Sequence, residues 1–216
     1  MPTFALIDFE TTGLSPDMGD RPTELAVLLI EQGRVVEEFS SLMNPGIPIP
    51  YEVQHLTGIT NAMVAKAPPV GTVLKQAMKV IGDRPLVAHN ASFDRRFWRA
   101  ETEHLRAASE ARFACTMLLA RRLYPEASNH RLGTLVRLHR LPAKRAHRAL
   151  ADVEMTFHLW SRMDRDVRAR FGGRALDFEL MCTLQKAKRD GLEAAVTKHF
   201  ARPKANIAKV RTRRRA

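Results

Sequence analysis

The feature that most constrains this fold is an apolar strand that runs directly into carboxylates. Residues 4–7 read Phe-Ala-Leu-Ile, and Asp8-Phe9-Glu10 follows without a break. Because side chains two residues apart on a strand share a face, Asp8 and Glu10 point one way while Ile7 and Phe9 point the other. Two carboxylates beside an apolar core repel each other unless a cation lies between them. We therefore predict a buried strand with a cation-binding end.

The composition is that of a folded chain. Its 216 residues fit one globular domain with a tail, or two small domains. With 45% of the residues hydrophobic and 27% charged, the composition excludes disorder for most of the chain. The longest apolar run, residues 25–30, is far shorter than the roughly 18 residues of a membrane helix, so we expect a cytoplasmic protein without a membrane partner. Cys115 and Cys182 have no metal-binding spacing, and we predict two buried free thiols.

The positive charge is concentrated near the C-terminus. Residues 174–216 carry 12 of the 35 Lys and Arg residues but only 4 of the 23 Asp and Glu residues. Within them, residues 202–216 contain no acidic side chain and little periodicity, which predicts a disordered basic tail that binds a polyanion such as nucleic acid. A solubilising tail without a partner is the alternative.

Hydropathy patterns predict strands first and helices later. The pattern indicates an α/β fold, with a sheet flanked by helices and a helical C-terminal extension. Ser92 is the expected N-cap of one helix. The predicted strands are 4–9, 24–31, 34–43, 85–89 and 112–115, and the predicted helices are 70–81, 93–107, 116–123, 131–140, 149–163, 176–190 and 192–200.

Two further polar segments share the spacing His-x4-Asp. His89 and Asp94 follow a predicted strand and open a helix, which is where α/β proteins bind ligands. His147 and Asp152 lie at the start of a later helix. Each aspartate is also a typical first-turn residue that complements the helix dipole, so the spacing alone leaves both interpretations open.

The three segments together contain the parts of a hydrolytic centre. Carboxylates can hold two divalent cations, for which Mg²⁺ or Mn²⁺ suits an all-oxygen ligand set. A histidine has a pKa near neutrality and can deprotonate an attacking water. Phosphodiester cleavage is the reaction that such a site suits.

At this point the sequence resembles the DEDD exonucleases of the His-containing (DEDDh) subgroup, and especially the proofreading epsilon subunit of bacterial DNA polymerase III. The resemblance covers residues 4–163 and includes Leu56-Thr57-Gly58-Ile59-Thr60 and Asn129-His130-Arg131-Leu132. It implies a ribonuclease H-like fold with a mixed central sheet. It further implies an exonuclease domain at residues 1–173, a helical extension at 174–201 and the basic tail at 202–216.

The implied activity is metal-dependent 3′ to 5′ removal of nucleoside monophosphates from single-stranded or frayed DNA ends. By this resemblance Asp8 bridges two cations, Glu10 and Asp152 bind the ion that holds the attacking water, and Asp94 acts on the second ion. His147 is the implied general base. The residues implied to contact the terminal nucleotides are Thr11, Thr12, Gly13, Leu14, Leu56, Thr57, Asn90 and Phe93.

Two departures from the family leave alternatives open. Thr57 stands where several members have a histidine, so a base contact by that histidine is not carried over. No clamp-binding motif of the type Gln-x-x-hydrophobic-x-Phe follows the nuclease segment, which leaves a partnership with a DNA polymerase subunit open. An exoribonuclease of the ribonuclease T kind is the neighbouring alternative, because no site residue reads the 2′ hydroxyl. The third interpretation is an inactive nucleic-acid-binding module.

Overall fold

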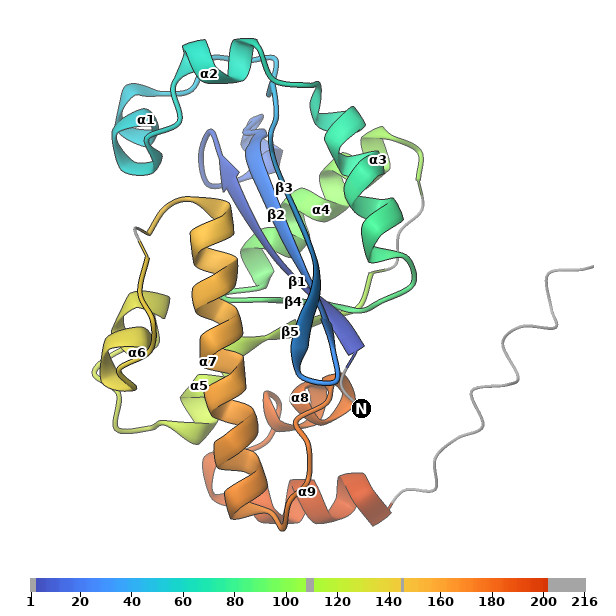
Figure 1. Ribbon diagram of the computed structural model, residues 1–216, viewed down its shortest axis with the longest axis vertical. Helices are drawn as coiled ribbons and strands as arrows, with labels where there is room; N and C mark the ends of the chain where they lie inside the picture. The colour runs from blue at the N-terminus through green and yellow to red at the C-terminus, as the bar shows by residue number, and fades with distance from the viewer. Residues whose placement is uncertain (1–2, 108–110, 145, 202–216) are drawn as a thin grey trace, which may run out of the picture.

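A computed structural model describes residues 3–107, 111–144 and 146–201 (Figure 1). Within them the chain forms a mixed sheet, as predicted, and its five strands lie in the order β3-β2-β1-β4-β5. Antiparallel pairing joins β1 to β2 and β2 to β3, whereas β4 is parallel to both β1 and β5. The strands are β1 (Thr3–Thr11), β2 (Pro22–Glu31), β3 (Arg34–Leu42), β4 (Leu86–Ala88) and β5 (Phe113–Cys115).

Helices cover both faces of this sheet. In Figure 1, α3 and α4 lie on one side of the central strands, and α7 with α5 and α6 lies on the other. The α-helices of the described residues are α1 (Tyr51–Thr57), α2 (Asn61–Ala65), α3 (Val70–Ile81), α4 (Ser92–His104), α5 (Thr116–Leu123), α6 (Leu132–Leu138), α7 (Ala149–Arg170), α8 (Phe178–Leu184) and α9 (Leu192–Ala201).

Strand β1 separates two hydrophobic cores. Ile7 and Phe9 are buried in the core under α3 and α4, whereas Phe4 and Leu6 are buried in the core under α7. On the α7 side Phe4 meets Trp160 edge to face, with ring centroids 5.0 Å apart. Each such fully buried side chain contributes roughly 1.5–3 kcal/mol to folding. The alternation puts Asp8 and Glu10 on the α7 side, as the strand period predicts.

Helices α8 and α9 pack on the same core as α7. Phe178, Leu184 and Val196 belong to the cluster that also contains Trp160. The domain boundary at residue 173 stays a prediction, and the tail at 202–216 lies outside the described residues.

Several sequence predictions need correction. Ser92 is the first residue of α4 rather than its N-cap, which is Ala91. Helix α7 extends to Arg170, beyond the predicted end at residue 163, because Val167 is buried and Arg162 and Asp166 form an i,i+4 ion pair. Cys115 is a buried free thiol as predicted, but Cys182 is only half-buried.

Helix α8 is much shorter than the predicted helix over 176–190. It starts after Asp177, whose side chain accepts a hydrogen bond from the Leu180 amide and caps the helix. Beyond Leu184 tertiary contacts take over, since the Gln185 side chain binds the backbone of β5 and the Ala187 carbonyl accepts from Arg122. Among the described residues, no helix combines the length and apolar character needed to span a membrane.

Candidate active site

The sheet topology brings the polar segments to one edge. Because β1 and β4 run parallel, their carboxyl ends lie side by side, which is where ligands bind in α/β sheets. The first turn of α7 reaches the same place. The shared cavity has a volume of about 640 Å³ and is lined by Asp8, Phe9, Glu10, His89, Asn90, Phe93, Asp94, Asn129, Arg131, Leu132, Gly133, Thr134, Arg137, Ala146, His147 and Asp152.

Three carboxylates from distant parts of the sequence converge in this cavity. Asp8, Glu10 and Asp152 each offer an oxygen, and these oxygens lie within 4.8 Å of one another. Asp94 lies behind them with only 2% of its surface exposed, and its Oδ1 accepts a hydrogen bond of 3.2 Å from the amide of Phe9. The two aspartates of the His-x4-Asp segments therefore reach the same site.

None of these four carboxylates forms an ion pair within the described part of the chain. Burial raises the pKa of Asp8 well above its usual range, and repulsion from Asp94 and Asp152 adds to the effect. Burial is also the largest cause that raises the pKa of Glu10 to about 8, of Asp94 to about 7, and of Asp152 above its usual value. Buried, crowded carboxylates whose charged forms lack a counter-ion fit a hard divalent cation, which favours those charged forms.

A fifth carboxylate, missed from the sequence, is already neutralised. Glu24 on β2 lies opposite Glu10 in the strand register and is 3% exposed. Arg148 donates to both of its oxygens at 2.6 and 3.1 Å, and the amide of Ala149 donates to Oε2 at 2.9 Å. Glu24 therefore links β2 to the start of α7. His147 lies just before this helix, and Asp152 lies in its first turn. A glutamate directly before the apolar run at residues 25–30 was the available signal.

The predicted nucleotide contacts after β1 form a turn held by its own side chains. Thr11 Oγ1 donates to the Gly13 carbonyl at 2.6 Å, and Thr12 Oγ1 accepts from the amide of Arg21 at 3.0 Å. A Cβ atom at Gly13 would overlap the Asp20 carboxylate, so any larger residue there would require the Asp20 side chain to move. The turn follows Glu10 directly, although its residues are not among those that line the cavity.

The remaining predicted contacts differ in exposure. Leu14 and Leu56 are apolar yet 77% and 55% exposed, whereas Thr57 is buried. The Thr57 hydroxyl donates to the Val53 carbonyl and accepts from the Ile59 amide, so it is already occupied. Two more predicted contacts, Asn90 and Phe93, line the cavity.

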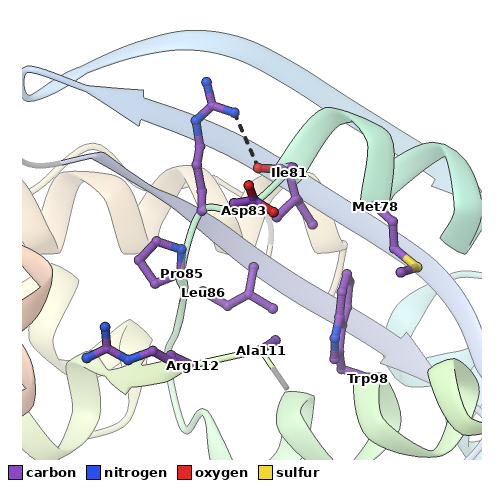
Figure 2. A pocket seen from close by; sticks show the side chains of 10 residues that line it. Met78, Ile81, Asp83, Pro85, Leu86, Trp98, Ala111 and Arg112 are labelled. Carbon is purple, nitrogen blue, oxygen red and sulfur yellow. Dashed lines mark hydrogen bonds between the residues drawn. The ribbon is translucent and has the colours of Figure 1, made fainter. Parts of the chain in front are cut away.

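A second cavity lies at the opposite end of β4. Figure 2 shows Pro85 and Leu86, where the strand begins, beside Trp98 and Arg112. Its volume is about 400 Å³, and Asp83 is the one carboxylate among its described lining residues. It has no group of clustered ligands, so the cleft at the carboxyl ends of β1 and β4 is the candidate active site.

The fold and the carboxylate cleft agree with the nuclease expected from the sequence, and comparison with known proteins identifies the family. The RNase T exonuclease family model matches residues 5–160, so the chain belongs to this exonuclease family. It is 39% identical over 166 residues to the PolC-type DNA polymerase III of Bacillus subtilis. The match covers 76% of this chain but only 12% of that polymerase.

Solved structures agree with this assignment. Exonuclease X, in complex with 5′-overhanging duplex DNA, is 30% identical with a TM-score of 0.64, and the match covers 84% of this chain and 99% of that one. The nuclease domain of 3'hExo, a DEDDh family member, has the same fold at 21% identity, with a TM-score of 0.65 over 76% of this chain and 92% of that one. The predictions of an exonuclease family and of a ribonuclease H-like fold are confirmed.

Proposed function

We propose that this nuclease is a metal-dependent 3′ to 5′ exonuclease that releases nucleoside monophosphates from single-stranded or frayed DNA ends. The observation that carries the proposal is the convergence of Asp8, Glu10 and Asp152, with Asp94 buried behind them and His147 beside them. The DNA bound to Exonuclease X and the polymerase identity of PolC support DNA as the substrate. The likeness to PolC is also what supports a polymerase partner.

The four carboxylates Asp8, Glu10, Asp94 and Asp152 would hold two divalent cations, Mg²⁺ or Mn²⁺. When bound, such cations acidify a water and stabilise negative charge on a phosphodiester. The amide of Phe9 fixes Asp94, and the clamp on Glu24 fixes the start of the helix that carries Asp152. These contacts hold the carboxylates in place before substrate arrives.

His147 is the proposed general base. It lies at the exposed rim of the cavity, five residues before Asp152, and its own amide donates to Asp152 Oδ2 at 3.0 Å. In the proposed reaction water adds to phosphorus, His147 takes the proton of that water, and the bond from phosphorus to the 3′ oxygen of the preceding nucleotide breaks. The terminal nucleotide leaves as a 5′-monophosphate.

The terminal nucleotide has apolar side chains at hand. Leu14 and Leu56 leave 77% and 55% of their surfaces exposed, so their apolar side chains are accessible to a ligand. We assign them to the faces of the terminal base and sugar. The backbone around Thr11 and Thr12 would meet the 3′ hydroxyl, with Asn90 and Phe93 next to the scissile nucleotide.

A gel time course tests the proposal. Single-stranded DNA, single-stranded RNA of equal length and a duplex with a mismatched 3′ end are labelled at the 5′ end and incubated with Mg²⁺, Mn²⁺ or chelator. We expect a metal-dependent ladder that shortens from the 3′ end, fastest on DNA. Faster shortening of RNA would favour the exoribonuclease. Release of the labelled 5′ nucleotide first, or no cleavage with either metal, would refute the proposal.

A further inference from the structure

One wall of the cleft carries positive charge that has no assigned role. Arg131 directly precedes α6 and Arg137 lies in its last turn, and both line the same cavity as the carboxylates. Thr134 lies between them and lines the cavity as well. Residues three apart on a helix are neighbours on one side, so these three side chains form a continuous stripe. On the other side of α6, Leu135 and Val136 are buried and hold the helix in place.

Both arginines are exposed and lack an acidic partner among the described residues. Arg137 Nη2 makes one long hydrogen bond of 3.5 Å to the Thr134 hydroxyl. The backbone amide of Arg131 donates to Asn129 Oδ1 at 3.0 Å, which fixes the turn and leaves the guanidinium available. By contrast, Arg21 and Arg148 are each held by a buried glutamate.

We propose that Arg131 and Arg137 bind the backbone phosphates of the substrate strand on the 5′ side of the scissile bond. This inference rests on the proposed function, because a strand whose last phosphodiester lies at the carboxylates must continue through the same cavity. A guanidinium matches phosphate in charge and in its fork of N–H donors. Six residues of α-helix rise about 9 Å, so the two groups can serve different phosphates of one strand.

The stripe would bind a strand without reading its sequence. Arginine contacts to phosphate fix the register of a nucleic acid but carry no base information. The stripe therefore predicts that affinity depends on substrate length and on salt, while hydrolysis of a single nucleotide ester depends on neither arginine. Loss of the carboxylates, by contrast, would abolish hydrolysis of both the strand and the nucleotide ester.

The test compares Arg131→Ala/Arg137→Ala with a matched control, Arg121→Ala/Arg165→Ala. The control removes two exposed arginines that likewise lack an acidic partner in the described part of the chain and do not line the cavity. Two substrates are used with Mn²⁺, the p-nitrophenyl ester of thymidine 5′-monophosphate and a single-stranded DNA octamer. Binding of a fluorescent octamer in chelator, followed by anisotropy over a range of salt concentrations, gives a readout without turnover.

For the stripe variant we expect the octamer KM to rise about tenfold and the octamer affinity in chelator to fall by a similar factor, since two exposed ion pairs are lost. Its log-log salt slope should fall by about 1.4, at about 0.7 for each phosphate contact on a single strand. Ester hydrolysis should stay within about twofold of wild type. The lysine pair Arg131→Lys/Arg137→Lys should recover part of the affinity, because it restores the charge but not the fork of N–H donors.

An unchanged octamer affinity and salt slope would overturn the inference, as would an equal loss in the control. An equal loss on the nucleotide ester would also overturn it, because the arginines would then act at the reacting phosphate. Weakened binding of an acidic peptide with no change for the octamer would assign the stripe to a protein partner instead. If wild-type protein hydrolyses neither substrate, the proposed function fails, whereas the binding measurement still decides on the stripe.

Discussion

The two His-x4-Asp segments have the same spacing and opposite surroundings. The His89 ring is engaged at both nitrogens, with Nδ1 2.9 Å from Thr116 Oγ1 and Nε2 2.9 Å from the His130 carbonyl. A carbonyl can only accept, so Nε2 carries the proton and Nδ1 accepts from the threonine hydroxyl. Burial lowers the pKa of His89 to about 4. This histidine is neutral and fixed at neutral pH.

His147 is the reverse case. It is exposed, its backbone has a φ of 66°, and its ring makes no hydrogen bond within the described part of the chain. A ring with a free nitrogen can take a proton from water, whereas a ring with both nitrogens occupied cannot. Asp94 and Asp152, however, both lie in the cleft. Equal spacing therefore accompanies the same position for the two aspartates, whereas different surroundings give the two histidines different properties.

The largest loss of activity should follow substitution of Asp94 or Asp152, because both segments place their aspartate in the cleft. We expect Asp94→Asn and Asp152→Asn each to lower kcat about 10³-fold or more, since each removes a charge from the proposed cation site without changing its shape. Exonuclease rates, together with Mn²⁺ binding measured by calorimetry, check this. If either variant kept a tenth of the wild-type rate, that aspartate would be a helix-capping residue and no ligand.

A smaller loss of activity should distinguish Glu24, which holds the start of α7, from Thr116, which binds the His89 ring. Glu24→Gln weakens the clamp that positions His147 and Asp152, and we expect kcat to fall about 10-fold to 100-fold with little change in KM. Thr116→Val removes a hydrogen bond of His89 and should cost about 1 kcal/mol of unfolding free energy with kcat nearly unchanged. Steady-state kinetics and urea unfolding measure both. Equal kcat losses would erase the distinction between the segments.

The third prediction concerns how the stability of the metal-free protein depends on pH. A carboxyl with a raised folded pKa keeps its proton while the unfolded chain has lost it, so its contribution to stability is lost as pH rises through the folded pKa. Asp94 and Glu10, at about 7 and 8, therefore predict that the melting temperature in chelator falls by several degrees from pH 6.5 to 8.

His89 does not disturb that measurement. Its folded pKa is lowered, so its contribution is complete above about pH 6.5 and is lost only as pH falls towards 4. Added Mg²⁺ should raise the melting temperature more at pH 8 than at pH 6.5, because protons compete with the cation at the lower pH. The Asp94→Asn variant is the control and should show a flatter profile. A melting temperature that rises from pH 6.5 to 8 in chelator would contradict the account.

Much of this arrangement was predictable from the sequence. The strand period places Asp8 and Glu10 on one face, and the apolar spacing gives the bounds of α3 and α5 correctly. Such features depend on neighbours a few residues away, which the sequence displays directly.

Long-range pairing was not predictable. Glu24 and Arg148 are 124 residues apart, and nothing local shows that one neutralises the other. The same reason explains the end of α8, where the Gln185 side chain binds the amide of Cys115. Local spacing could not rank the two histidines either, because Thr116 and the His130 carbonyl, which occupy the His89 ring, come from outside its segment.

The most direct test of the account is the ranking of the two histidines. His147→Ala and His89→Ala are compared in single-turnover hydrolysis of 5′-labelled single-stranded DNA at saturating Mn²⁺, after circular dichroism and calorimetry have shown that both fold and bind metal. We expect His147→Ala to lose about 10² to 10⁴ in rate with metal binding preserved, and His89→Ala to lose less than about tenfold. A larger loss for His89→Ala would contradict the assignment of the base and the physical argument behind it.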